Sequence, residues 1–508
     1  MVRLSHLFIT ITCCFVIISC AGKKQAEPNN PNVLFIIADD LGYTDIEAYG
    51  SSFYDTPNIN SVIDNSVKFN SGYANSPVCS PSRASFQTGK YPVKTGVTDW
   101  IKGRKAFQGT TVTDRWIVPD TDYELKLEET TIAEVLRKNN YVTAFIGKWH
   151  LGEEEKYFPE YQGYDINIAG WKMGRPNTGK GKKGYFSPYG NPRLKDGPIG
   201  EYLPDRLTEE AIKILKDNIG KPTFICLSYY LVHGPFQAKK NEIEIYNKKR
   251  IHKGINKEEE FLENQSWMQF ATGNNPKKYK ERIKQGHPIY AAMVKSLDDN
   301  IGKLVNYLKT SGQYDNTLII FVSDNGGLST KEGSPTSNLP LAKGKGWMHE
   351  GGIRVPFFIK PPRFKSSKIS DIPVTGIDIF PTILSYTDNH SIVKDIDGVD
   401  LKPLIEANKP LKKRPIYWHY PHYGNQGANP SSAVRFGDYK LIQDLETGGY
   451  ELYNLKEDIG ETTNLFNSKT DIAEKLKKML TAWVSENYNR PLIENPEWNK
   501  KDSIINYN

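Results

Sequence analysis

The residue types most suited to covalent chemistry lie around Cys79, in the run SPVCSPSRA at residues 76–84. The chain has five cysteines, and Cys79 fits neither a disulfide framework nor the paired spacing of a zinc site. Pro81, Ser82 and Arg83 follow it closely, a pattern that indicates a reactive position. The alternative is a buried structural cysteine beside a turn-forming proline, the usual role of an isolated cysteine.

Acidic and amide side chains follow two apolar runs and could bind a hard cation. Asp39 and Asp40 come directly after the run NVLFIIA, and Asp324 and Asn325 come directly after TLIIFVS. An Asp-Asp pair could also cap a following helix. Adjacent carboxylates in a buried cleft repel each other unless a cation is present, and oxygen ligands suit Ca²⁺ or Mg²⁺. The second pair therefore favours a single divalent-cation site.

The run CSPSRASFQTG at residues 79–89 resembles the signature of the type I, formylglycine-dependent sulfatases, members of the alkaline-phosphatase-like superfamily. In that family the cysteine is oxidised after synthesis to formylglycine, whose hydrated aldehyde is the nucleophile. Phe86 stands where the family usually has leucine, a departure that affects packing rather than chemistry. The resemblance favours the covalent interpretation of Cys79 and implies a sulfatase, that is, a sulfuric ester hydrolase.

The same resemblance assigns roles to further residues. Arg83 helps to hold the modified residue in its charged form, and Asp39, Asp40, Asp324, Asn325 and residue 79 hold one metal ion, usually calcium. In GKWHLG, Lys148 contacts both the sulfate and the nucleophile, and His150 hydrogen-bonds the formylglycine hydroxyl and assists the release of sulfate. His233 binds the sulfate and protonates the leaving oxygen. Lys345 matches the second sulfate-binding lysine, with Lys343 as the nearby alternative.

The mechanism that the resemblance implies has two steps. One hydroxyl of the hydrated formylglycine attacks sulfur and the alcohol departs, which leaves residue 79 transiently sulfated. The other hydroxyl then expels sulfate and regenerates the aldehyde, with Asp324 as the expected base for the attack. A cysteine thiol could not complete the second step, so turnover requires a formylglycine-generating enzyme or an anaerobic sulfatase-maturating enzyme as a partner.

The substrate is expected to be a sulfated polysaccharide or oligosaccharide, because an exported sulfatase meets such polymers. Aromatic, histidine and acidic residues after the signature and in YWHYPHY at residues 417–423 are the candidates for sugar contacts: Asp99, Trp100, His349, His419 and His422. Two other functions stay open. One is a phosphonate or phosphodiester hydrolase of the same superfamily, and the other is a non-catalytic glycan-binding surface lipoprotein.

Four apolar, β-prone runs alternate with amphipathic segments and predict an α/β fold with a mostly parallel sheet. The predicted strands are Asn32–Ala38, Val142–Ile146, Thr223–Tyr229 and Thr317–Ser323. The predicted helices between them are Thr130–Asn139, Leu207–Asn218 and Tyr290–Thr310. Polar motifs follow three of the strands, where ligands bind in such sheets. The segment between His233 and His287 is expected to form surface helices and loop without chemistry.

The sequence predicts four units: a signal peptide at 1–19, a tether at 20–31, a catalytic domain at 32–405 and a C-terminal α+β subdomain at 406–508. In the subdomain, short strands at 416–420, 432–436, 439–442 and 450–453 precede a helix near 472–487. They are expected to form a small antiparallel sheet like that of sulfatases.

The N-terminus and the composition of the chain limit where the protein can be located and what it can bind. Arg3 precedes an apolar stretch too short to span a bilayer, and Cys20 follows IIS as in a bacterial lipobox. We therefore expect an exported lipoprotein, lipidated at Cys20, facing the periplasm or the cell surface and touching the membrane only through its anchor. An ordinary signal peptide is the alternative. The 508 residues have a formal charge of +7 with mixed signs, which does not indicate nucleic-acid binding.

Overall fold

The computed structural model describes residues 30–111, 114–263, 280–389, 393 and 395–498. An eight-stranded sheet has the order β12-β2-β11-β10-β1-β7-β5-β6. Its strands β10, β1, β7, β5 and β6 run parallel, and β11 runs antiparallel to β10 and β2. The predicted mixed, mostly parallel sheet is thus confirmed. The bounds are β1 Asn32–Ala38, β2 Val67–Phe69, β5 Val142–Gly147, β6 Ile166–Ile168, β7 Thr223–Ser228, β10 Thr317–Ser323, β11 Phe357–Lys360 and β12 Lys368–Ser370.

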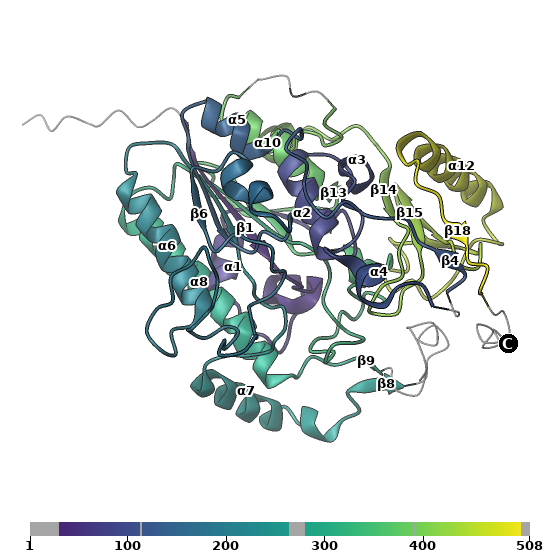
Figure 1. Cartoon of the computed structure of the whole chain (residues 1–508), viewed down its shortest axis with the longest axis horizontal. Coiled ribbons are helices and arrows are strands. Elements are labelled where there is room, and N and C mark those ends of the chain that lie inside the picture. The colour runs from purple at the N-terminus through teal and green to yellow at the C-terminus, as the bar shows by residue number, and fades with distance from the viewer. Residues whose placement is uncertain (1–29, 112–113, 264–279, 390–392, 394, 499–508) are drawn as a thin grey trace, which may run out of the picture.

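Helices cover both faces of this sheet, because successive residues of a strand point to opposite faces and both sets are apolar here. Leu34 and Ile36 of β1 lie in one core with α1 (Pro57–Ile63), α6 (Leu203–Asp217) and α8 (Pro288–Thr310), and α7 (Lys240–His252) packs against α8. Val33 and Phe35 lie in the other core with α2 (Cys79–Thr88), α5 (Ile132–Lys138) and α10 (Ile379–Tyr386). Figure 1 shows the two helical layers on either side of the sheet.

A four-stranded antiparallel sheet follows near the C-terminus, with the order β14-β15-β16-β17. Its strands are Ile416–Tyr420, Ser431–Phe436, Tyr439–Asp444 and Tyr450–Asn454. One face packs on α12 (Thr470–Asn487), and the other packs on residues of the large unit such as Tyr73 and Ile353. The predicted boundary after residue 405 falls inside α11 (Lys402–Ala407), so the division into units stays a prediction.

The remaining elements are short. The segment between His233 and His287 contains α7 and, beyond the expected helices, a pair of strands, β8 and β9. The other short elements are β3 Gly72–Tyr73, α3 Pro92–Thr95, α4 Gly103–Gln108, β4 Trp116–Ile117, β8 Phe261–Glu263, β9 Lys280–Arg282, α9 Glu350–Ile353, β13 Val374–Thr375 and β18 Ile493–Glu494.

The predicted signal peptide, Cys20 and most of the tether lie outside the described residues. Within the part of the chain that the structure describes, no helix is both long enough and apolar enough to cross a membrane.

Candidate active site

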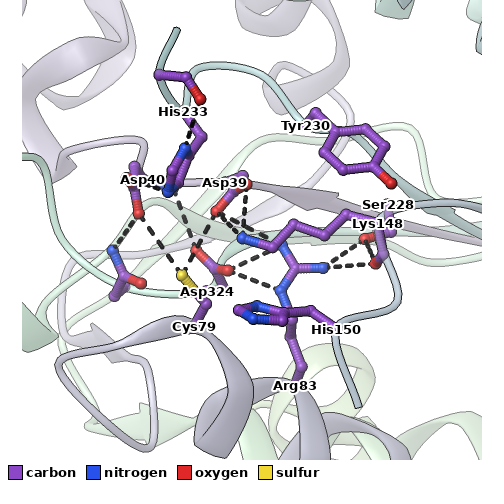
Figure 2. A network of polar contacts seen from close by, with 12 residues as sticks. Asp39, Asp40, Cys79, Arg83, Lys148, His150, Ser228, Tyr230, His233 and Asp324 are labelled. Carbon is purple, nitrogen blue, oxygen red and sulfur yellow. Dashed lines mark hydrogen bonds and ion pairs between the residues drawn. The ribbon is translucent and has the colours of Figure 1, made fainter. Parts of the chain in front are cut away.

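Four parallel strands end at one edge of the sheet, and each delivers polar side chains to the same place. Asp39 and Asp40 follow β1, Lys148 and His150 follow β5, Ser228 ends β7, and Asp324 and Asn325 follow β10. Figure 2 shows Asp39, Asp40 and Asp324 gathered around Cys79, which is the first residue of α2. The arrangement is the usual one for open α/β sheets, in which ligands bind outside the carboxyl ends of the strands.

Cys79 is buried, and its sulfur lies between the two neighbouring aspartates. The Sγ atom is 3.8 Å from Asp39 Oδ1 and 3.9 Å from Asp40 Oδ1. Burial raises the pKa of the thiol to about 12, although Lys148 and Lys345 act in the opposite direction. Because the thiolate is the reactive form of a cysteine, the unmodified side chain is a poor nucleophile at neutral pH.

Each of the two adjacent aspartates has its own lysine. Lys148 Nζ donates to both carboxylate oxygens of Asp39 at 2.8 Å, and Lys345 Nζ donates to Asp40 at 2.7 Å. Burial raises the pKa of Asp39 to about 8. Burial also acts on Asp40, but Lys345 and its other cationic neighbours outweigh it and hold the pKa of that carboxyl well below its usual range.

The acidic cluster has the donor set of a divalent cation. One atom each from Asp39, Asp40, Cys79 and His233 lies within 4.8 Å of the others. The Oδ1 atom of Asn325 is buried without a hydrogen-bond partner. Such an orphaned oxygen is costly unless a ligand satisfies it, and oxygen donors suit hard cations. The residues present therefore fit one divalent cation.

Arg83 joins the acidic cluster to the strand ends from below. Its Nε atom donates to Asp324 Oδ2 at 2.8 Å, and its Nη1 atom donates to the carbonyl of Lys148 at 2.8 Å and to Ser228 Oγ at 2.6 Å. Although burial opposes ionisation of Asp324, Arg83 and Lys148 lower the pKa of that carboxyl. Arg83 therefore acts on Cys79 through the aspartates that surround it, and it is a positioning residue (Figure 2).

Two histidines flank the site. His150 Nε2 lies 2.7 Å from the carbonyl oxygen of Ile101, while its Nδ1 atom is buried without a partner. Burial and then Lys148 lower the pKa of His150 well below its usual range. His233 is only partly buried, with Nε2 at 3.6 Å from Asp40 Oδ2. Burial lowers the pKa of His233 to about 3, although Asp40 acts to raise it.

Asp40 and His150 share an uncommon backbone conformation. Both are in the left-handed region, with φ of 62° and 56°. Non-glycine residues adopt it at a cost of about 1–3 kcal/mol, and such strain is often found at functional sites. Here it turns the chain sharply after β1 and β5, which brings both side chains over the sheet edge.

A cavity of about 540 Å³ opens above Cys79. Its volume is within the range of small-molecule sites. Among the predicted residues, Trp100, His150, His233 and Lys345 line it together with Cys79. Lys343, the alternative to Lys345, lines a different cavity and lies over the ring of Trp347.

Of the five residues expected to contact sugar, Trp100 lines this cavity and the other four do not, so their contact with sugar stays a prediction. Asp99 accepts a hydrogen bond from Tyr420, and His422 hydrogen-bonds to Thr98. His419 contacts Ser432, and His349 pairs with Glu451 in the second cavity. The aromatic cluster at residues 417–423 packs the small sheet against the large unit, as Trp418 does through its bond to the Ala74 carbonyl.

Several residues of the cavity were not predicted from the sequence. Ser228, a buried residue behind the cavity, was also not predicted; it accepts a hydrogen bond from Arg83 at the end of β7. The unpredicted lining comes from loops without a motif: Lys102, Glu153, Lys172, Met173, Gly174, Arg175, Glu332, Asn425 and Gln426. The one sequence signal that could have pointed to them is the density of lysine and arginine after residue 170.

The fold and the site together define an alkaline-phosphatase-like hydrolase, in which acids, lysines and histidines meet a nucleophile position at the end of a mostly parallel sheet. A family model described as Sulfatase matches residues 31–389. The chain belongs to the sulfatase family and is a sulfuric ester hydrolase. A second model, described as N-sulphoglucosamine sulphohydrolase, C-terminal, matches residues 343–486.

Similar proteins cover nearly the whole chain. A sulfatase of Formosa agariphila is 27% identical, over 96% of this chain and 96% of its own. An N-acetylglucosamine-6-O-sulfatase of Bacteroides thetaiotaomicron is 25% identical, over 91% of this chain and 87% of its own. The crystal structure of Ps i-CgsB in complex with k-i-k-neocarrahexaose has a TM-score of 0.70 and 26% identity, over 93% of this chain and 96% of that one.

Proposed function

We propose that this sulfatase removes sulfate from a sulfated oligosaccharide or polysaccharide, with a formylglycine made from Cys79 as nucleophile and one Ca²⁺ ion as cofactor. The observation that carries the proposal is the position of Cys79. Its sulfur lies between Asp39 and Asp40 beneath the open cavity, and each of these aspartates is paired with a lysine.

A formylglycine at residue 79 would supply a hydroxyl nucleophile and a second hydroxyl that can expel sulfate, and a bound cation would supply positive charge beside them. Asp39, Asp40, Asp324 and Asn325 would hold that cation. Calcium is favoured because it accepts many oxygen ligands in flexible geometry. Lys148 and Lys345 neutralise the sulfate oxygens and keep the sulfur in line for attack.

The histidines move the protons. His233 donates a proton to the departing alcohol oxygen, for which it is placed at the cavity wall. The negative charge of a bound sulfate acts to raise the pKa of this histidine from the low value that burial gives it. His150 accepts a proton at its free Nδ1 atom and assists the release of sulfate.

A carbohydrate substrate is supported by the relatives and by the cavity. The Bacteroides relative is named for a sulfated amino sugar, and the Ps i-CgsB structure contains an oligosaccharide. The cavity is open and contains polar side chains with one aromatic ring, Trp100, on its wall. Sugars bind to such surfaces through hydroxyl hydrogen bonds and contact with aromatic faces.

The two alternative functions would require other features of this site. A phosphonate or phosphodiester hydrolase would need the same cation but not a matched pair of lysines and histidines. A non-catalytic glycan-binding lipoprotein would keep residue 79 as cysteine in its native host. Export as a lipoprotein anchored through Cys20, and a maturation enzyme as partner, belong to this proposal.

The test is desulfation of a panel of defined sulfated oligosaccharides by enzyme co-expressed with a maturation factor. Mass spectrometry confirms formylglycine at residue 79, and sulfate is measured by ion chromatography. We expect sulfate release from at least one carbohydrate and much slower turnover of the matched phosphate ester. If confirmed formylglycine enzyme releases no sulfate from any carbohydrate, the proposal is wrong.

A further inference from the structure

The segment between β6 and α6, residues 169–202, is strongly basic. It contains seven lysine and arginine residues and two acidic residues. Arg193 is neutralised, because it pairs with Glu155 and Glu160. Lys172 and Arg175 are exposed and line the cavity above Cys79. The excess positive charge of this segment therefore reaches the mouth of the active site.

The backbone holds these two residues in place beside the catalytic histidine. A Cβ atom added to Gly174, which lies between them, would be 2.4 Å from Cε1 of His150, so the chain packs directly on the imidazole ring. The backbone of Trp171 accepts a hydrogen bond from the His150 amide at 3.4 Å, and Asn191 Nδ2 donates to the Ala169 carbonyl at 2.9 Å. Lys172 and Arg175 thus project from a fixed base.

The side chains of Lys172 and Arg175 are electrically uncompensated. Among the described residues, neither has an ion pair or a hydrogen bond, whereas Lys102 at the same cavity pairs with Glu153 at 3.3 Å. Deeper in the cavity, Lys345 is compensated by Asp40. On another part of the wall, Glu332 accepts a hydrogen bond from Gln426 at 2.9 Å. Free positive charge at this cavity is therefore concentrated on the 172–175 side.

We propose that Lys172 and Arg175 bind a second anionic group of the substrate, a sulfate or a carboxylate, on the sugar that carries the scissile sulfate or on its neighbour. The proposal rests on the proposed function and names its substrate class as carbohydrates with more than one anionic group. A guanidinium and an ammonium together match the oxygens of such a group, with Arg175 able to donate two parallel hydrogen bonds.

The experiment compares substrates and variants of the formylglycine enzyme. Oligosaccharides that the wild type desulfates are sorted into those with a second sulfate, those with a carboxylate and those with neither, and 4-nitrophenyl sulfate is the small reference. For the double variant Lys172→Gln and Arg175→Gln, we expect kcat/KM for the substrates with a second anion to fall about tenfold relative to the reference. Comparing the oligosaccharides that have a second sulfate with those that have a carboxylate shows which of the two groups Lys172 and Arg175 bind.

Lys180→Gln is the matched control, because it removes one charge from the same segment at an exposed position that does not line the cavity. Lys180→Gln should leave unchanged the ratio of kcat/KM for substrates with a second anion to kcat/KM for 4-nitrophenyl sulfate. The wild-type preference should also shrink with added salt, since the site is exposed. Equal kcat/KM for neutral and anionic oligosaccharides, or an equal loss on all substrates in the double variant, overturns the proposal. Absence of any carbohydrate desulfation overturns the proposed function instead.

Discussion

Lys345 donates a hydrogen bond to Asp40 at 2.7 Å, although the two residues are 305 positions apart in the chain. Lys148 makes the equivalent contact with Asp39, so each member of the acidic pair is neutralised by a lysine from a different loop. Each lysine opposes the rise in pKa that burial gives its carboxyl, and for Asp40 the cationic neighbours outweigh burial. In the proposed mechanism, the same two ammonium groups bind the negative oxygens of the sulfate ester.

Replacing Lys345 should therefore impair catalysis strongly. We expect Lys345→Met to lower kcat/KM by about 10²–10³, the usual effect of removing one donor from an oxyanion site. Lys343→Met is the matched control, because this lysine lines the other cavity. Sulfate release by both variants, with thermal unfolding as a check on folding, is the measurement. Equal losses in the two variants would refute the assignment of Lys345.

Cation binding should depend on the acidic cluster. We expect titration calorimetry of the metal-free chain to show one Ca²⁺ site, and saturation at about 100 times Kd to add about 2.7 kcal/mol of stability. Asp324→Asn should abolish the binding heat, while Glu332→Gln, on the cavity wall away from the cluster, should keep it. Full activity after chelation and gel filtration would show that no cation is required.

His233 should matter most when the leaving group is a poor one. A sugar alkoxide needs a proton to depart, whereas 4-nitrophenolate does not. We expect His233→Gln to lower kcat for a sugar sulfate by about 10²–10⁴, the range for a general acid, and to lower kcat for 4-nitrophenyl sulfate much less. Steady-state kinetics on both esters measures the difference. Equal losses would mean that His233 only binds sulfate.

A buried ion pair between the large unit and the small sheet should make stability depend on acidic pH. Lys440 Nζ lies 2.8 Å from Glu350 Oε1 and 2.6 Å from Glu461 Oε1, and all three side chains are inaccessible or nearly so. Burial acts to raise the pKa of Glu350, but Lys440, Arg354 and Arg435 lower it to about 2.

Because the folded pKa of Glu350 is depressed, its contribution is full above the ordinary pKa of 4.5 and is lost as pH falls from there towards 2. Thermal unfolding midpoints between pH 7 and pH 3 should fall less steeply for Glu350→Gln than for the wild type. At pH 7, Lys440→Met should cost about 3–5 kcal/mol, because it leaves buried carboxylates unpaired. Lys477→Met, in an exposed pair, should change stability by less than about 1 kcal/mol.

The sequence was sufficient for residues that follow directly on buried strands. Asp39, Asp40, Asp324 and Asn325 come after continuous apolar runs, and parallel strand ends must meet at one edge. The strand β1, predicted as Asn32–Ala38, has those bounds in the structure. Long apolar runs have few alternatives to a buried strand, so this part of the fold and site followed from local pattern.

The sequence was insufficient where tertiary packing decides the role of a side chain. His419 and His422 were candidates for sugar contacts, but they hydrogen-bond to Ser432 and Thr98 and do not line the cavity above Cys79. Conversely, Lys172 and Arg175 belong to no motif, and only the folded loop brings them to the cavity. An aromatic or basic residue outside a helix or strand can be buried or exposed at a similar local cost in free energy. Its neighbours in the sequence therefore do not determine whether it is buried.

The most direct test of the central claim compares sulfate release by preparations that differ in the chemical state of residue 79. One preparation is co-expressed with a maturation enzyme, a second retains cysteine, and a third is Cys79→Ala; mass spectrometry defines residue 79 in each, and turnover of the sulfated panel is measured. We predict sulfate release in proportion to formylglycine content, none from the alanine variant, and retained oligosaccharide binding by that variant. Turnover by the cysteine or alanine chain at the rate of the formylglycine enzyme would contradict the account.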